Sequence, residues 1–124
     1  MPRPLLAVVV VLAALAGCRD TSVEEMAAAK TGGDVARGRT AIGKYGCAGC
    51  HTIPGIDNAV ATVGPTLERI ASRSTLRGKV PNTPENIMKW LQNPQQIDPK
   101  SPMPAMGVTD TDARDIAAFL YTLR

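Results

Sequence analysis

The chain has 124 residues and a formal net charge of +3 at neutral pH, with no block of basic residues. Its length suits one domain, and its weak, scattered charge argues against nucleic acid as a partner. Aromatic residues make up only 3% of the chain, so a stable core of this size needs further material, such as a bound prosthetic group.

The first predicted element is a secretory signal in residues 1–17. Arg3 precedes an apolar run over residues 5–15, which is shorter than the about 20 residues that cross a bilayer. The sequence LAGC, which ends at Cys18, resembles the lipobox of bacterial lipoproteins, whose cysteine is lipidated and becomes the mature N-terminus. The alternative is an ordinary signal peptide cleaved nearby. We expect lipidation of Cys18, which would anchor the protein to the periplasmic face of a membrane in the bacterial cell envelope.

Residues 18–33 are predicted to form a flexible tether. They are polar or small, with the pair Glu24-Glu25 and a run of alanines at 27–29, and they offer little apolar surface to bury. A coil of this length reaches roughly 20 Å, which would let the domain swing between partners. We expect the folded domain to occupy residues 34–124.

A helix is expected to open this domain, running from Asp34 towards Cys47. Asp34 is a favourable N-cap residue. Val35, Gly38 and Ile42 recur at helical spacing and would form the buried stripe.

This helix leads into the sequence CAGCH at residues 47–51, the signature of covalent c-type haem attachment. Two thiols three positions apart can each add to a vinyl group on the same edge of a haem, and the next residue is the proximal iron ligand. The alternatives are a redox dithiol or half of a zinc site. Zinc normally needs four nitrogen or sulfur ligands, and the chain has a single histidine and one further cysteine. We therefore expect Cys47 and Cys50 to hold one haem c, with His51 on the iron.

The single histidine also limits the second axial position of the iron. Ligation by two histidines is impossible within one chain, which leaves a methionine, a weaker ligand such as lysine, or an open position. A His/Met pair raises the reduction potential and suits electron transfer, whereas an open position suits gas binding or peroxide chemistry.

Residues 52–63 are expected to form a loop. Gly64-Pro65 is a turn signal, followed by a predicted short helix with Leu67 and Ile70 on one face.

Two further helices complete the prediction. Thr83 caps the first, which ends at Asn93 before Pro94, and Thr109 with Asp112 forms a capping-box-like start for the last. Their buried stripes are expected at Ile87, Trp90, Leu91, Ile116, Phe119, Leu120 and Leu123. No strand pattern is visible, so the predicted class is all-α, with about four short helices around one haem.

From about Gly33 to Leu123 the chain resembles the small class I c-type cytochromes. Residues 33–38 resemble the start of that family's N-terminal helix, which crosses the C-terminal helix through a small residue. The sequence GPTL at residues 64–67 resembles the family's Gly-Pro-x-Leu turn. The resemblance implies that the carbonyl of Pro65 accepts the Nδ1–H of the proximal histidine, with Leu67 beside the haem.

The same resemblance implies further haem contacts. Arg73, eight residues after the turn proline, stands where many relatives place an arginine near a buried propionate, with Arg69 and Arg77 as alternatives. Trp90 and Leu91 resemble the aromatic-Leu pair that packs against the haem on its methionine side.

Met103 is the implied sixth ligand, because relatives place that ligand nine residues after the proline equivalent to Pro94. Its flanking prolines restrict the backbone, which reduces the entropy lost on holding the sulfur at the iron. Met106 is the alternative, and we expect it instead to fill a gap in the core.

We therefore expect a membrane-tethered monohaem electron carrier outside the cytoplasm, not an enzyme. Redox proteins would be its partners, such as a terminal oxidase or a quinol-oxidising complex, and no small-molecule substrate is expected. Two alternatives stay open: a haem subunit of a larger oxidoreductase complex, and a haem-based sensor in which the methionine leaves to admit a small ligand.

Overall fold

The computed structural model describes the backbone of residues 18–124 and the side chains of residues 23–124. The signal sequence predicted for residues 1–17 and the side chain of Cys18 lie outside these described residues. Within residues 18–124, no helix combines the length and the apolar character that crossing a membrane requires.

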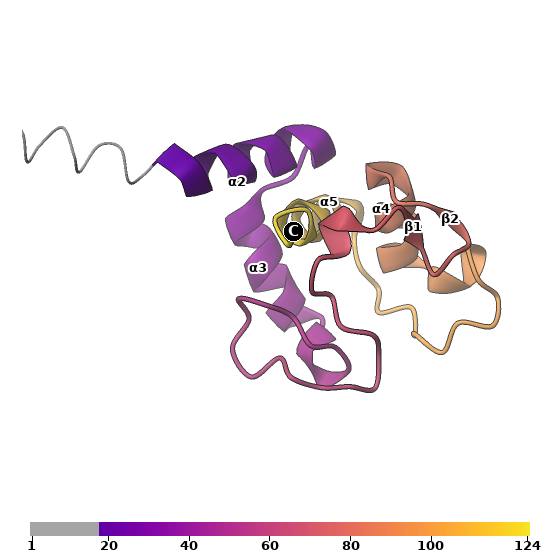
Figure 1. Ribbon diagram of the computed structural model, residues 1–124. Helices are drawn as coiled ribbons and strands as arrows, with labels where there is room; N and C mark the ends of the chain where they lie inside the picture. The colour runs from indigo at the N-terminus through magenta and orange to yellow at the C-terminus, as the bar shows by residue number, and fades with distance from the viewer. Residues whose placement is uncertain (1–17) are drawn as a thin grey trace, which may run out of the picture.

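Four α-helices form the frame of the described chain (Figure 1). They are α2 (Cys18–Thr31), α3 (Val35–Lys44), α4 (Pro84–Gln92) and α5 (Asp110–Leu120). Single 3₁₀ turns and a small antiparallel hairpin connect them: η1 (Cys47–Gly49), η2 (Ile70–Ser72), β1 (Thr75–Leu76), β2 (Val80–Pro81) and η3 (Pro94–Gln96). The predicted all-α class is confirmed, and the hairpin is too short to leave an alternating pattern in the sequence.

In Figure 1, α5 lies at the centre of the molecule, with α2 and α3 on one side and α4 on the other. Asp34 caps α3 as predicted, because its carboxylate accepts the N–H of Arg37 at 2.8 Å. A Cβ added to Gly38 would overlap the backbone carbonyl of Asp115, so only glycine lets α3 cross α5 this closely.

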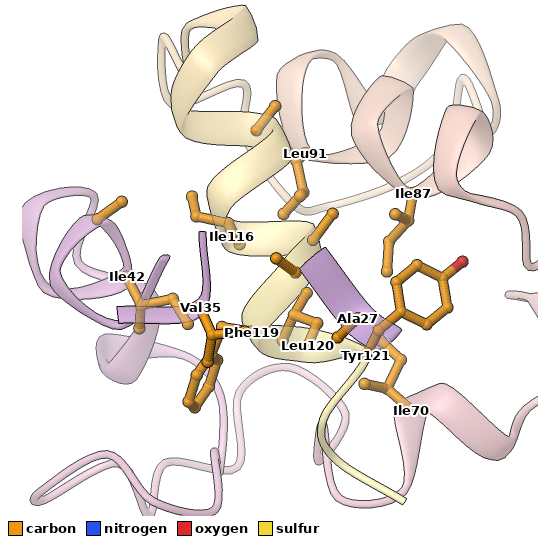
Figure 2. Close-up of a cluster of buried hydrophobic side chains, with 14 of the residues drawn as sticks. Ala27, Val35, Ile42, Ile70, Ile87, Leu91, Ile116, Phe119, Leu120 and Tyr121 are labelled. Carbon is orange, nitrogen blue, oxygen red and sulfur yellow. The ribbon is translucent and has the colours of Figure 1, made fainter. Parts of the chain in front are cut away.

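The core is built around the buried face of α5. Ile116 lies between Ile42 of α3 and Leu91 of α4 (Figure 2), and the exposed fractions of these side chains are 1%, 1% and 8%. Phe119 and Leu120 are buried as predicted. Of the stripe residues predicted in the two later helices, Trp90 and Leu123 are only half-buried.

The flexible tether predicted for residues 18–33 is not what the structure contains, because most of this segment forms α2 and packs against α5. Ala27 and Thr31 are buried, and the Thr31 hydroxyl donates to the Ala27 carbonyl at 2.9 Å. The Lys30 ammonium lies 4.1 Å from the centre of the Tyr121 ring, a cation–π distance. Alanines are strong helix formers, and the buried Ala27 also allows α2 to pack closely on α5.

The helix predicted after Pro65 is also shorter than expected. Only the 3₁₀ turn η2 forms, directly after Arg69, whose backbone φ of +55° is left-handed and interrupts a regular helix. Ile70 is buried as predicted, whereas Leu67 is half-buried.

Candidate haem-binding site

The predicted site residues line one cavity of about 300 Å³. Its walls come from α3, η1 and the loop that follows, β1, α4, the loop before α5, and α5 itself. Every residue predicted to contact the cofactor lines this cavity: Cys47, Cys50, His51, Pro65, Leu67, Arg73, Trp90, Leu91 and Met103. Most of the remaining lining is aliphatic, including Ile42, Ile53, Ile87 and Ile116, which suits the face of a porphyrin.

The attachment thiols lie in one tight turn. The N–H groups of Cys50 and His51 both donate to the carbonyl of Cys47, at 3.2 and 3.1 Å, so a single turn of the backbone brings all three residues to the cavity wall. Both thiols are free, with Cys47 half-buried and Cys50 exposed. Burial raises the pKa of the Cys47 thiol.

The imidazole of His51 is fixed by the turn that follows. Its Nδ1 lies 2.6 Å from the carbonyl oxygen of Pro65, the contact that the family resemblance implied. Because a carbonyl can only accept, Nδ1 carries the proton and Nε2 keeps its lone pair available for a metal. A Cβ added to Gly64 would lie 2.5 Å from Cε1 of His51, so the ring packs directly on the backbone there.

The loop before α5 brings Met103, and not Met106, to the cavity. The indole N–H of Trp90 donates to the Met103 sulfur at 3.2 Å. The side-chain amide of Gln95 donates to the carbonyls of Ser101 and Met103, at 3.1 and 2.7 Å, and so braces the loop. Gln95 carried no signal in the sequence, because its role depends on contacts within an irregular loop.

The core role expected for Met106 was wrong. Its side chain is 46% exposed and does not line the cavity. It precedes Gly107, which turns the chain with a φ of +74° before α5.

The charged side chains that line the cavity are basic. Arg73 donates from Nη2 to the carbonyls of Thr66 and Glu68, at 2.5 and 3.1 Å, and Arg77 lines the same cavity. Arg69, the other alternative raised by the sequence, is exposed and does not line it.

A buried carboxylate that no sequence motif signals connects the start of α3 to α5. Asp115 is 2% exposed and accepts the Nε–H and Nη2–H of Arg37, at 2.8 and 3.0 Å, and the N–H of Asp34, at 2.7 Å. These hydrogen bonds, that of Arg37 foremost, hold the pKa of Asp115 below its usual value. The cluster fixes the start of α3, the helix that leads into residues 47–51.

The donor set fits a c-type haem: two thiols and an imidazole with an available Nε2 at one side, and a thioether sulfur from another segment of the same apolar cavity. In the described part of the chain, no cluster of three or more His, Cys, Asp or Glu side chains could hold a metal ion.

Comparisons with known proteins agree with this chemistry. The chain is 28% identical over 89 residues to cytochrome c oxidase subunit 2 of Alkalihalophilus pseudofirmus, a match that covers 71% of the chain and 25% of that protein. It is 31% identical over 71 residues to cytochrome c oxidase subunit 2 of Bacillus sp. strain PS3, covering 56% of the chain and 20% of that protein. The chain therefore spans a quarter or less of the length of these curated relatives. No solved structure matches it.

A family model described as cytochrome c matches residues 35–124, from the first residue of α3 to the end of the chain. This match spans the attachment motif, the histidine turn and the loop that carries Met103. The chain therefore belongs to the cytochrome c family and carries haem c bound covalently through Cys47 and Cys50.

Proposed function

We propose that this cytochrome is a monohaem electron carrier with His51 and Met103 as axial ligands, anchored through a lipidated Cys18 to the periplasmic face of a bacterial membrane. Family membership supports the electron-transfer role. The observation that carries the ligand assignment is that His51 and Met103 line one cavity while Met106 lies outside it. Haem supplies a one-electron couple, and the protein supplies its orientation, burial and electronic environment.

Hydrogen bonds within the protein already fix the two proposed axial ligands, His51 and Met103. The Pro65 carbonyl fixes the tautomer of His51 and makes its Nε2 more electron-donating. Trp90 and Gln95 hold the side chain and the backbone of Met103. A site that is already organised changes little between oxidation states, which suits a carrier better than a centre that must open to admit a ligand.

The lipid anchor is supported by the sequence LAGC that ends at Cys18. In the Cys18→Ser variant we expect an uncleaved or soluble protein that still carries haem, because the attachment thiols are untouched. Partition between detergent and water, with the mature N-terminus read by mass spectrometry, tests this. Wild-type protein extracted by salt alone, without detergent, would contradict the anchor.

The names of the two curated relatives, both cytochrome c oxidase subunits, support a terminal oxidase as the electron acceptor. A quinol-oxidising complex would be a suitable donor. The test is to mix the reduced protein with detergent-solubilised membranes and to follow its oxidation with and without an oxidase inhibitor. We expect oxidation that the inhibitor stops. Oxidation that is unaffected by the inhibitor would exclude the oxidase as the acceptor.

The same names favour a second candidate, a fixed haem subunit of an oxidase complex. A carrier and a subunit differ in how they purify. A carrier elutes from size-exclusion chromatography in detergent as a small protein, whereas a fixed subunit co-elutes with the other oxidase chains at any salt concentration.

A further inference from the structure

The turn between β1 and β2 holds an arginine where the backbone disfavours one. The N–H of Lys79 donates to the carbonyl of Leu76 at 2.9 Å, and the two central residues, Arg77 and Gly78, have φ values of +52° and +65°. Two positive central φ angles are the pattern of a type I′ turn, which prefers asparagine or glycine at the first central position. Arginine in this conformation costs free energy, which suggests that its side chain has a role that offsets this cost.

That side chain lines the haem cavity and is oriented by a buried carboxylate. Nη2 of Arg77 lies 3.5 Å from Oδ2 of Asp98, whose side chain is only 7% exposed. The other carboxylate oxygen of Asp98 accepts the N–H of Lys100 at 3.2 Å, which fixes the group in its loop. Asp98 does not line the cavity itself, so it holds the Arg77 guanidinium from the side away from the cavity.

The positive charge of the cavity lining favours an anion beside Arg77. Arg73 and Arg77 line it, and no aspartate or glutamate does. Haem c carries two propionate carboxylates, and a carboxylate in an apolar cavity needs a cationic partner. Nη2 of Arg73 already donates to two backbone carbonyls. Among the residues that the structure describes, Asp98 alone pairs with the Arg77 guanidinium, which leaves most of its N–H groups for a ligand.

We propose that Arg77 is a propionate-binding residue of this cytochrome and that Asp98 positions it. The inference rests on the covalent haem of the family and is independent of whether the protein moves between partners or is fixed in a complex.

The variant Arg77→Asn tests this, because asparagine suits a positive φ and removes only the charge and the fork of donors. Arg69→Asn is the matched control: Arg69 has a φ of +55°, is exposed and lies off the cavity. The readout is the midpoint potential of each holoprotein across a range of pH. Loss of a cation beside the haem disfavours the reduced form, so we expect a lower potential in Arg77→Asn and an unchanged one in Arg69→Asn.

The pH profile separates propionate binding from a structural role. An arginine stabilises an ionised carboxylate and lowers its pKa, so its removal raises that pKa. We expect the pH-dependent fall in potential to move to higher pH in Arg77→Asn and to move back towards the wild-type position in Arg77→Lys. Identical pH profiles for Arg77→Asn and Arg69→Asn would overturn the proposal, whatever happens to stability.

A double variant separates the propionate from Asp98, the titratable group that faces Arg77. In Arg77→Asn/Asp98→Asn the pH-dependent step must persist, because it belongs to the haem carboxylate. Its disappearance would assign the step to Asp98 and overturn the proposal.

Discussion

The backbone of Gly64 lies so close to the imidazole of His51 that there is no room for a side chain at this position. Its N–H donates to the carbonyl of Cys50 at 2.7 Å, and the next residue supplies the carbonyl that holds Nδ1. One hydrogen bond therefore closes the loop between the attachment motif and the turn that orients its histidine.

We predict that Gly64→Ala destabilises the holoprotein by about 1–3 kcal/mol, because the added Cβ would lie 2.5 Å from Cε1 of His51 and either the ring or the turn must move. Denaturant unfolding followed by the haem absorption measures this. Gly43→Ala is the control, since Gly43 lies in α3 with nothing near its Cβ position, and alanine there should be neutral or slightly stabilising. Equal stability of the two variants would contradict the close packing of Gly64 on His51.

The crossing of α3 and α5 combines a close backbone approach at Gly38 with the ion pair of Arg37 and Asp115. Because α3 leads directly into residues 47–51, this crossing also sets the position of the attachment thiols relative to the core.

We predict that Asp115→Asn lowers the free energy of unfolding at pH 7 by about 1.5–3 kcal/mol, the usual range for hydrogen bonds to charged groups. The folded-state pKa of Asp115 is depressed, so its contribution is complete above the unfolded pKa of about 3.9 and is lost as the pH falls towards the folded value. Unfolding measured between about pH 7 and 3 should therefore show a shallower loss of stability in the variant than in wild type. The exposed Asp57→Asn serves as control. A slope unchanged by Asp115→Asn would contradict the role of this ion pair.

The starts of α3, α4 and α5 could be predicted because N-capping is local, whereas α3 ends at Lys44, short of the predicted Cys47. In α4 the hydroxyl of Thr83 accepts the N–H of Asn86 at 3.2 Å, and in α5 Thr109 accepts that of Asp112 at the same distance. The docking of α2 could not be predicted, since its buried contacts come from small side chains at Ala27 and Thr31 that leave no amphipathic pattern.

Cavity residues could be predicted where haem chemistry requires particular residue types at short, fixed spacings, as it does at residues 47–51. The residues that support the cavity from far along the chain could not. Asp115 meets its partner Arg37 across 78 positions, and Asp98 meets Arg77 across 21, and no sequence period signals either contact.

The domain as a whole folds around its cofactor. Helices α3, α4 and α5 and the Met103 loop all contribute walls to the same apolar cavity, whose lining includes Ile42, Ile116 and Leu120 of the core. Without haem, this surface would be left without packing partners.

We therefore predict that Cys47→Ala/Cys50→Ala yields little cooperatively folded protein, because the cavity of about 300 Å³ is left unfilled. Far-UV circular dichroism during heating measures this, with Cys18→Ser as the variant expected to keep both haem and a cooperative transition. A sharp unfolding transition in the haem-free protein would contradict the dependence on cofactor.

The central claim is that His51 and Met103 hold the haem iron from both sides in a closed electron-transfer site. The most direct measurement is the rate of carbon monoxide binding to the reduced protein, in wild type, Met103→Ala and Met106→Leu. We predict slow or no binding in wild type and Met106→Leu, and rapid binding with a lowered reduction potential in Met103→Ala. Rapid binding by the wild type would contradict the claim and indicate a ligand-binding sensor, and rapid binding by Met106→Leu alone would make Met106 the ligand.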